Sequence, residues 1–484
     1  MKKSKINKKS FIAFCLGVVA VLLVTKLTTP LKNQQEPEDL FLQIVKMAPL
    51  PLPYHSLTKD DIRELMGLVV PGVWNVSEKS VEKVQAELQK MFAPQWQAAY
   101  KEIDSDESML EFMAGSGLLE ALNLDKAEAL RKLQSINTDV HAFTPVSPSA
   151  EYYPLTPPDT PVRYPGEYEP IGAVFVSWPV YHLKDDWTVH LNLVAEIVSE
   201  AEAWILVPNE YWQKAVELYL AQNQIGLSNV KFFHVPTNDI WTRDFVPITV
   251  ATGTDSGHAL IWNPYQPLGL RSVLHDAGAG AVLGAYLNVP VHRLPIVIEG
   301  GNIITDGKGT ILMMDSVFDN NPEINKSDLE QIAKDYLGAN RLITFPIVPG
   351  EACGHIDMVA KFVDADTIMV AQVPANHPWY KSLENMAATL AGTDSVNGAK
   401  YEIIRIQLPT MIHEIQEWTY LNSLTLNKKV IVPVYGAAED EAALQVYREA
   451  IPSRTVVSVN ELNYGGGAVH CQTKEVPASL SDKY

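Results

Sequence analysis

The sequence predicts an α/β protein in which a helical region precedes a domain of repeated strand modules. Three observations support this fold class. A glycine-poor stretch between residues 56 and 137 carries apolar residues at helical spacing, and seven prolines then fall between Pro145 and Pro165. After Pro165, short apolar runs typical of strands alternate with helical patterns. With 484 residues and 47% hydrophobic content, the chain is long enough for two or three globular domains.

The first 30 residues form a targeting element. Five lysines precede an unbroken apolar run from Phe11 to Val24, which is the pattern of a secretory signal peptide or an N-terminal membrane anchor. The run is shorter than the roughly 17–25 residues of a typical membrane span. A buried core helix is the alternative, and the lysine cluster disfavours it. We therefore expect an exported protein that is periplasmic, secreted or anchored through residues 11–24 and faces away from the cytoplasm.

The domain organisation follows from changes in composition. Residues 31–55 are predicted to be a polar linker, and residues 56–144 an accessory helical region with no catalytic constellation. Within that region, Ser80–Ile103 and Ser108–Leu133 show helical periodicity. The proline-rich residues 145–165 cannot form a helix or a central strand, so they mark a boundary. Residues 166–484 are the predicted catalytic domain.

Local signals place several elements in this last domain. Ala173–Trp178 is a buried strand candidate, and Ser327–Gly338 is predicted as a helix with a Ser327/Glu330 capping box and a closing glycine. Three polar kernels lead into hairpins, within residues 300–313, 354–370 and 421–432. Modules repeated at intervals of tens of residues predict a propeller-like assembly around a shared centre.

Composition also limits the function. The net charge of −19 argues against a nucleic-acid partner and is compatible with a cationic substrate. Of three cysteines, Cys15 lies in the N-terminal apolar run, so only Cys353 and Cys471 belong to the globular part. This excludes a disulfide scaffold and a cysteine-rich metal cluster.

The polar kernels carry the residues with chemical potential. Cys471 follows the run Gly465–Gly467, which lets the backbone approach a ligand closely, although free cysteines are more often buried apolar residues. His355 and Asp357 are two residues apart, and on a strand they would share one face. A second carboxylate, Asp244, stands beside Arg243 in an apolar context.

A thiol, an imidazole and two carboxylates suit the hydrolysis of a guanidine. A guanidinium is planar and cationic, and carboxylates pair with it in bidentate fashion. Two carboxylates can therefore hold it while a thiolate adds to its central carbon, and the histidine protonates the departing ammonia.

Other interpretations of the same residues remain. Asp244 and Arg243 form a structural ion pair in one, His355 is a satisfied core histidine in another, and Cys353 is a small buried residue without a role. A metal site of His355, Asp357 and His470 is disfavoured because the ligands lack helical spacing. We predict no metal and no cofactor. A papain-type protease is disfavoured because its local cysteine signature is absent.

Six ordered motifs make the resemblance specific. Residues from about Val162 to Pro477 resemble the agmatine deiminase and bacterial-type peptidylarginine deiminase family of guanidino-group-modifying enzymes, the penteins. The motifs are Pro165-Gly166-Glu167-Tyr168-Glu169-Pro170, Trp241-Thr242-Arg243-Asp244, Glu299-Gly300-Gly301-Asn302, Gly354-His355-Ile356-Asp357, Asn422, and Gly466-Gly467-Ala468-Val469-His470-Cys471. The resemblance implies a five-fold pseudosymmetric α/β propeller.

The resemblance also implies roles for individual residues. Cys471 would be the nucleophile that forms a thiouronium intermediate, His355 the general acid and base, and Asp244 and Asp357 the guanidinium clamps. Asn422 would support the site. The substrate contacts are expected to be Asp244, Asp357, Trp241, Glu299, Asn302 and Gly467.

The favoured substrate is peptidylarginine, converted to peptidylcitrulline, with agmatine, converted to N-carbamoylputrescine, as the alternative. Pro264-Tyr265 agrees with the peptidylarginine type, but Gln266 and Leu268 stand where that type has arginines, and Arg271 is a candidate substitute. Ser423, where agmatine enzymes have an aromatic residue, and the predicted export favour a peptide. An amidinotransferase and an inactive binding protein are less favoured alternatives.

Overall fold

The computed structural model describes residues 79–81, 83–84, 103–143, 156–180, 184–237, 239–253, 257–263, 265, 274–349, 351, 353–409, 418–461 and 468–482. The predicted targeting element lies outside them. Among the described helices, none combines the length and apolar character that crossing a bilayer requires. The chain divides into two units, and all elements named below belong to the unit formed by Ile103–Leu268 and Ser272–Tyr484.

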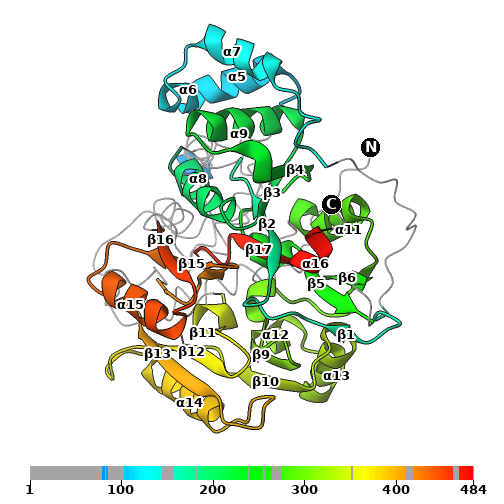
Figure 1. Cartoon of the computed structure of the whole chain (residues 1–484), viewed down its shortest axis with the longest axis vertical. Coiled ribbons are helices and arrows are strands. Elements are labelled where there is room, and N and C mark those ends of the chain that lie inside the picture. Colours follow the sequence, from blue (N-terminus) through cyan, green and yellow to red (C-terminus); the bar gives the residue numbers. More distant parts are fainter. Residues whose placement is uncertain are drawn as a thin grey trace. The chain divides into compact units, whose positions relative to one another are not determined.

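Residues 103–143 of the helical region contain three helices: α5 (Asp106–Gly115), α6 (Leu118–Ala121) and α7 (Lys126–Ser135). The sequence pattern predicted one continuous stretch over Ser108–Leu133. The helix is broken because Gly117 adopts a left-handed conformation at φ 79° and Asp125 caps α7. These helices pack on α9 (Glu210–Gln222) and share its hydrophobic core, as Figure 1 shows. Most of the predicted helix Ser80–Ile103 lies outside the described residues, and the domain boundaries stay a prediction.

Five small sheets make up the rest of the described fold, which confirms the α/β class. The first contains β17 (Thr473–Pro477), β2 (Ile171–Ser177), β3 (Glu202–Val207) and β4 (Val230–His234). The second contains β1 (Val162–Arg163), β5 (Ile248–Thr252), β6 (Gly257–Trp262) and β7 (Val291–Arg293). The third contains β8 (Ile304–Thr305), β9 (Thr310–Met314) and β10 (Arg341–Phe345). The fourth contains β11 (Ala360–Phe362), β12 (Thr367–Gln372) and β13 (Glu402–Gln407). The fifth contains β14 (Leu424–Thr425), β15 (Lys429–Val434) and β16 (Thr455–Asn460).

Each sheet repeats one arrangement. A first strand pairs antiparallel with a second, and a helical connection then leads to a third strand that lies parallel to the second. The connecting helices are α8 (Lys184–Ile197), α11 (Leu274–Leu287), α12 (Ser316–Asn320) with α13 (Lys326–Leu337), α14 (Tyr380–Ala391) and α15 (Asp440–Ala450), and they can be followed in Figure 1. The module therefore recurs five times.

A polar kernel stands directly before the first strand of every module. These kernels are α10 (Thr242–Phe245) before β5, the 3-10 turn η4 (Gly300–Asn302) before β8, and the 3-10 turn η5 (Ile356–Met358) before β11. Asn422 precedes β14, and Cys471 precedes β17. The remaining short elements are η2 (Leu227–Asn229) before β4 and α16 (Ala478–Ser481) after β17.

The local predictions are largely confirmed. The three hairpins are β8–β9, β11–β12 and β14–β15, and the strand predicted at Ala173–Trp178 is β2. The helix at Ser327–Gly338 is α13, and Gly338 ends it at φ 71°, but the predicted cap is wrong. Asn325 accepts the backbone N–H groups of Ser327 and Asp328, so the helix begins earlier than the Ser327/Glu330 pattern indicated.

The strand predicted through His355 and Asp357 is also wrong. Gly354 turns the chain at φ 67°, a conformation that favours glycine, and residues 356–358 then form η5 before β11 begins. The two side chains therefore reach the same region from a tight turn and not from alternate positions of a strand.

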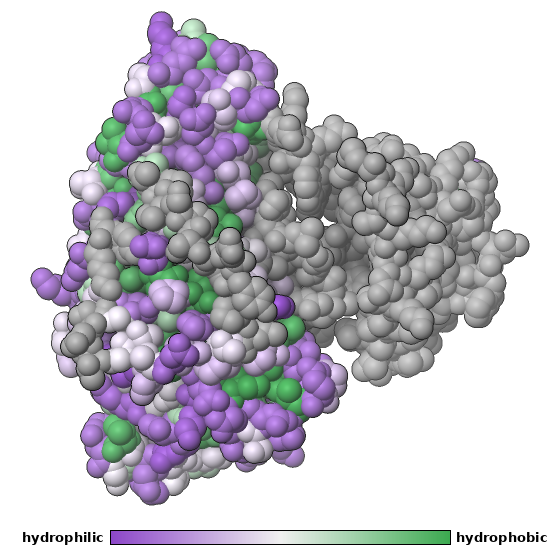
Figure 2. Space-filling model, turned by 90° about the vertical axis from the view of Figure 1, so that its right-hand side faces the viewer, coloured by the Kyte–Doolittle hydropathy of each residue, from purple (hydrophilic) through white to green (hydrophobic). Residues whose placement is uncertain are grey.

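Buried apolar side chains fill the space between these elements in four clusters, one of which contains Cys471. On the face shown in Figure 2, the described surface is mostly hydrophilic, with apolar residues in separate patches. The described part of this face therefore has no continuous apolar area.

Candidate active site

Cys471 is held in place by its neighbours. Its side chain is only 2% exposed and lies directly before β17. The side-chain amide of Asn422 bonds both the side chain and the backbone of Cys471. Its Nδ2 donates to Sγ at 3.1 Å, and its Oδ1 accepts the Cys471 backbone N–H at 3.0 Å. The backbone N–H of Arg243 donates to the Cys471 carbonyl at 3.0 Å, so Cys471 is hydrogen-bonded to α10. The sulfur therefore has a defined position.

Asp357 lies beside this sulfur. Its Oδ2 is 3.9 Å from Sγ of Cys471 and accepts hydrogen bonds from Asn422 Nδ2 at 3.2 Å and from the His470 ring Nδ1 at 2.7 Å. Its other oxygen, Oδ1, is buried and has no hydrogen-bond partner. An unsatisfied buried carboxylate oxygen is costly, and a cationic ligand would satisfy it.

Asp244 is positioned by the contact between α10 and η4. Gly301 N–H donates to its Oδ1 at 2.9 Å. A side chain on Gly300 would place its Cβ 2.1 Å from the Arg243 carbonyl, so only glycine allows the two turns to pack this closely. Arg243 pairs with Glu475 at 2.6 Å, so the structure contradicts the interpretation of Asp244 as its partner.

His355 is buried, but it is not a satisfied core histidine. Its Nε2 contacts Oε2 of Glu299 at 2.6 Å, whereas Nδ1 lies 3.8 Å from Asp244 Oδ1 and has no partner within hydrogen-bonding geometry. The Glu299 contact orients the ring and leaves Nδ1 without a hydrogen-bond partner.

Gly301 marks the point where three of these side chains converge. A Cβ atom built on this glycine would lie 2.6 Å from Nδ1 of His355, 2.9 Å from Oδ1 of Asp244 and 3.2 Å from Oδ2 of Asp357. The structure therefore brings together the predicted residues Cys471, His355, Asp244, Asp357, Asn422 and Glu299.

The ionisation of the two carboxylates differs. Burial raises the pKa of Asp244 to about 7, and Glu299 and Asp357 add to this while His355 opposes it. Burial also acts to raise the pKa of Asp357, but the hydrogen bond and charge of His470 outweigh it and leave that pKa below its ordinary value.

The thiol and the imidazole are shifted upward. Burial raises the pKa of Cys471 to about 12, with the charge of Asp357 adding to the shift and the nearby His355 ring opposing it. Burial acts to lower the pKa of His355, but the charge of Asp244, the nearby Cys471 and the contact with Glu299 hold it well above its ordinary value. Without a ligand, the site therefore contains a neutral thiol and an imidazolium.

The other predicted substrate contacts are less clearly engaged. The Asn302 amide is occupied by the Met314 backbone and the Ser316 hydroxyl, so its bonds are structural. Trp241 begins α10 and packs against two hydrophobic clusters. Gly467 lies outside the described residues. Substrate contact by Trp241 and by Gly467 therefore stays a prediction.

Cys353 is half-buried beside His355, in the wall of a cavity of about 230 Å³ that Glu299 also lines. The sequence assigned it no role.

Sequence reasoning missed three contributors, namely Gly301, Glu167 and His470. Glu167 Oε2 contacts Nε2 of His470 at 2.8 Å, and the other ring nitrogen contacts Asp357. Glu167 and His470 both lie inside motifs of the sequence analysis, and the position of His470 next to Cys471 could have indicated a role for it. The contact between Glu167 and His470 was not predictable from the sequence, since 303 positions separate them.

Two groups of side chains could supply metal ligands. Asp244, Glu299 and His355 form one, and Glu167, His470 and Glu475 form the other, with one potential ligand atom from each residue lying within 4.8 Å of the rest. In the second group the carboxylates are already paired with Lys361 and Arg243. The prediction of a metal-independent site stays a prediction.

The chain is similar to deiminases over most of its described part. A family model with the description Porphyromonas-type peptidyl-arginine deiminase matches residues 163–477, more than half of the chain. Two relatives carry the name "Putative agmatine deiminase". The one from Vibrio parahaemolyticus is 25% identical over 368 residues, and the one from Streptococcus mutans is 28% identical over 366 residues. Both alignments cover 67% of this chain, and they cover 99% and 98% of the relatives.

Solved structures agree. The "Putative Arginine Deiminase from Porphyromonas gingivalis" aligns with a TM-score of 0.58 and 25% identity, over 65% of this chain and 98% of its own. The agmatine deiminase of Enterococcus faecalis aligns with a TM-score of 0.59 over 69% of this chain and 99% of its own. At 22% identity, the latter likeness concerns the fold alone.

Proposed function

This chain belongs to the Porphyromonas-type peptidyl-arginine deiminase family of guanidino-group hydrolases, and from that premise we propose that it deiminates agmatine. The observation that carries the proposal is the convergence of the Cys471 sulfur, the His355 ring and two carboxylates, Asp244 and Asp357, at one buried position. Such an arrangement matches a planar cation whose central carbon is attacked from one side.

The choice of agmatine replaces the preference for peptidylarginine drawn from the sequence. The relatives named agmatine deiminase align over nearly their whole length, which supports a small guanidine as substrate. Ser423, which had favoured a peptide, is fully buried, and its hydroxyl lies 2.8 Å from the Tyr447 hydroxyl. Its identity therefore says little about the substrate.

Peptidylarginine remains the second candidate. The description of the matching family and the Pro264-Tyr265 pair favour it. Tyr265 is buried against Phe245, whereas residues 266–271, which bear on this choice, lie outside the described part of the chain.

Substrate binding would prepare the nucleophile. A guanidinium between Asp244 and Asp357 would offer N–H groups to the unpartnered Asp357 Oδ1 and would neutralise the charges that hold the Cys471 thiol protonated. A bound cation therefore lowers the pKa of Cys471 from about 12 and favours the thiolate, and the thiol proton passes to solvent because His355 is already protonated.

The reaction then needs one proton carrier. The Cys471 sulfur adds to the guanidinium carbon, and the C–N bond breaks as His355 protonates the departing amine, which leaves as ammonia. The thiouronium that remains is attacked by water, and His355 accepts a proton from that water. The C–S bond breaks, the ureido product forms, and Cys471 is released. Glu299 keeps the ring oriented throughout.

The fold supports this reaction if the five modules form a five-fold pseudosymmetric α/β propeller. The recurrence of the same strand and helix order in five sheets supports the propeller, as does the position of one kernel before each module. Each kernel would then contribute from its own blade to a common centre.

The test is ammonia release from the full chain supplied with agmatine, free arginine and arginine-containing peptides. We expect the highest kcat/KM with agmatine and a carbamoyl product in equal amount to ammonia. The Cys471→Ser variant is the control, and it should fold normally and release no ammonia. Peptide preference would select the second candidate, and transfer of the amidine to an added amine would indicate an amidinotransferase. Ammonia release by Cys471→Ser, or none with any guanidine, would refute a Cys471-dependent deiminase.

A further inference from the structure

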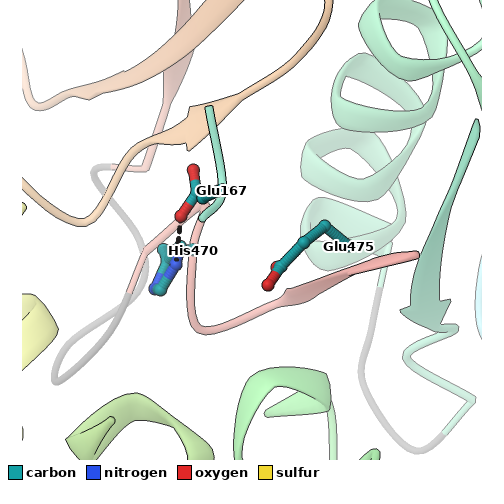
Figure 3. Close-up of side chains that lie close together, drawn as sticks. All are labelled: Glu167, His470 and Glu475. Carbon is teal, nitrogen blue, oxygen red and sulfur yellow. Dashed lines mark hydrogen bonds and ion pairs between the residues drawn. The ribbon is translucent and has the colours of Figure 1, made fainter. Parts of the chain in front are cut away.

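A buried ion-pair network lies behind Asp357, on elements that the proposed reaction does not use. Figure 3 shows Glu167 and His470 pointing toward each other, with Glu475 approaching from β17. Glu167 Oε2 is 2.8 Å from His470 Nε2, and its Oε1 accepts from Lys361 Nζ and from the Thr425 N–H, both at 2.6 Å. Glu167 is therefore a fixed anion facing the His470 ring.

The two ring nitrogens of His470 each contact a carboxylate. Nε2 contacts Glu167, and Nδ1 contacts Asp357 Oδ2 at 2.7 Å. A neutral imidazole carries a single N–H, whereas an imidazolium donates from both nitrogens. With the ring 4% exposed and two carboxylates in contact, the imidazolium is the form that satisfies both bonds.

We propose that Glu167 and His470 are positioning residues that keep Asp357 ionised and hold its Oδ1 toward a bound guanidinium. The inference rests on the proposed function, since it assumes that both carboxylates bind the substrate cation. It explains why two carboxylates around one ligand site have different surroundings. Asp357 Oδ2 lies 2.7 Å from the His470 ring, whereas Asp244 accepts a backbone N–H, faces Glu299 and lies 3.8 Å from the nearest nitrogen of His355.

The same contacts fix the orientation of Asp357. Oδ2 is bonded to His470 and Asn422, which leaves the unpartnered Oδ1 for the ligand. Loss of His470 would remove both the counter-charge and one of the two bonds that orient the carboxylate.

Two other cations, His355 and Arg243, also lower the pKa of Asp357, but each acts less strongly than His470, and His355 is already in contact with Glu299. Glu475 is paired with Arg243 at 2.6 Å, and Lys361 with Glu167. The groups that face this network are Glu167, Asp357, Glu475, Arg243, His355, Lys361, Lys474 and the Tyr164 phenol. A metal ion at Glu167, His470 and Glu475 would have to displace the Lys361 and Arg243 side chains from these carboxylates.

The experiment measures agmatine binding by calorimetry in the Cys471→Ser background of the full chain, between pH 5 and pH 8. With His470 present, we expect affinity to fall about tenfold per pH unit below pH 7, because only Asp244 takes up a proton. With His470→Gln or Glu167→Gln added, it should fall about one hundredfold per pH unit, because Asp357 then also takes up a proton.

Two further variants serve as controls. Glu167→Asp keeps the negative charge, so its agmatine affinity should fall only about tenfold per pH unit, as it does with Glu167. Glu384→Gln removes the carboxylate of another 2.6 Å ion pair, with Arg405, outside this network and should leave the dependence unchanged. Circular dichroism reports folding, and if His470→Gln does not fold, Glu167→Gln decides.

The outcomes separate the two proposals. No agmatine binding by Cys471→Ser at any pH would contradict the proposed substrate. Binding whose pH dependence stays the same in His470→Gln and Glu167→Gln would overturn the role of these two residues only. Tighter binding on addition of Zn²⁺ alone would also overturn it, because the cluster would then be a metal site.

Discussion

Asp244 is expected to destabilise the folded protein at neutral pH, and replacing it with asparagine should reveal this. Its pKa is about 7, against an ordinary value of 3.8, because burial disfavours the carboxylate. Native Asp244 therefore holds a proton that the unfolded chain has released, and stability falls as the pH rises from about 4 to 7. A shift of about three units corresponds to roughly 4 kcal/mol at pH 8, so we expect Asp244→Asn to stabilise the protein by roughly 2–4 kcal/mol. Asparagine keeps the oxygen that accepts from Gly301.

Asp357→Asn provides the matched control, with the opposite sign. The pKa of Asp357 is lowered by His470, so its contribution to stability is present above its ordinary value of 3.8 and is lost as the pH falls through the depressed native pKa. This variant should be destabilised at pH 8, although both substitutions abolish turnover.

The assay is thermal unfolding of wild type, Asp244→Asn and Asp357→Asn at pH 5 and pH 8. For a domain of about 320 residues, a gain of 2–4 kcal/mol corresponds to a rise of roughly 3–6 °C in Tm. The rise for Asp244→Asn should be present at pH 8 and much smaller at pH 5. An equal loss of Tm in both variants at pH 8 would refute the reasoning that the surroundings stabilise the ionised form of Asp357 but disfavour that of Asp244.

Two other predictions concern the same site. Gly301→Ala places a methyl group 2.6 Å from the His355 ring, so kcat/KM should fall on the order of 100-fold, whereas Gly278→Ala, where no atom lies within 4 Å, should leave it unchanged. A small effect of the first substitution would mean that the site is not centred there. In a background with both Cys15→Ser and Cys353→Ser, ultraviolet thiolate absorbance should stay low up to about pH 10, because burial and the nearby carboxylates raise the pKa of Cys471 to about 12, and added guanidinium should shift the titration to lower pH. An unshifted titration would contradict a cation bound beside the sulfur.

Local physics accounts for the features that the sequence predicted correctly. The β8–β9 hairpin follows from the turn residues Asp306-Gly307 between apolar runs, and α13 from its apolar spacing and from Gly338. The strand β2 follows from a continuous apolar run. Each of these depends on interactions within a dozen residues, which is the range that a sequence pattern reports.

Local competition explains the errors. Asn325 and Ser327 both suit a helix cap, and the side chain that reached two backbone N–H groups began α13. The spacing of His355 and Asp357 fits a strand, yet the left-handed Gly354 commits the chain to a 3-10 turn. Sequence alone does not rank such alternatives, because their energies differ by about 1 kcal/mol or less.

From the sequence alone, one can identify which side chains belong to the site, because cysteine, histidine and carboxylates stand in kernels where strand periodicity does not require them. Five of the predicted residues, Cys471, His355, Asp244, Asp357 and Asn422, do converge. Their protonation was decided only by the tertiary structure. A histidine 113 positions away holds the pKa of Asp357 below its ordinary value, whereas burial, with Glu299 and Asp357 adding to it, raises the pKa of Asp244 to about 7. Charge depends on burial and on neighbours, and those neighbours are brought together only by the folded chain.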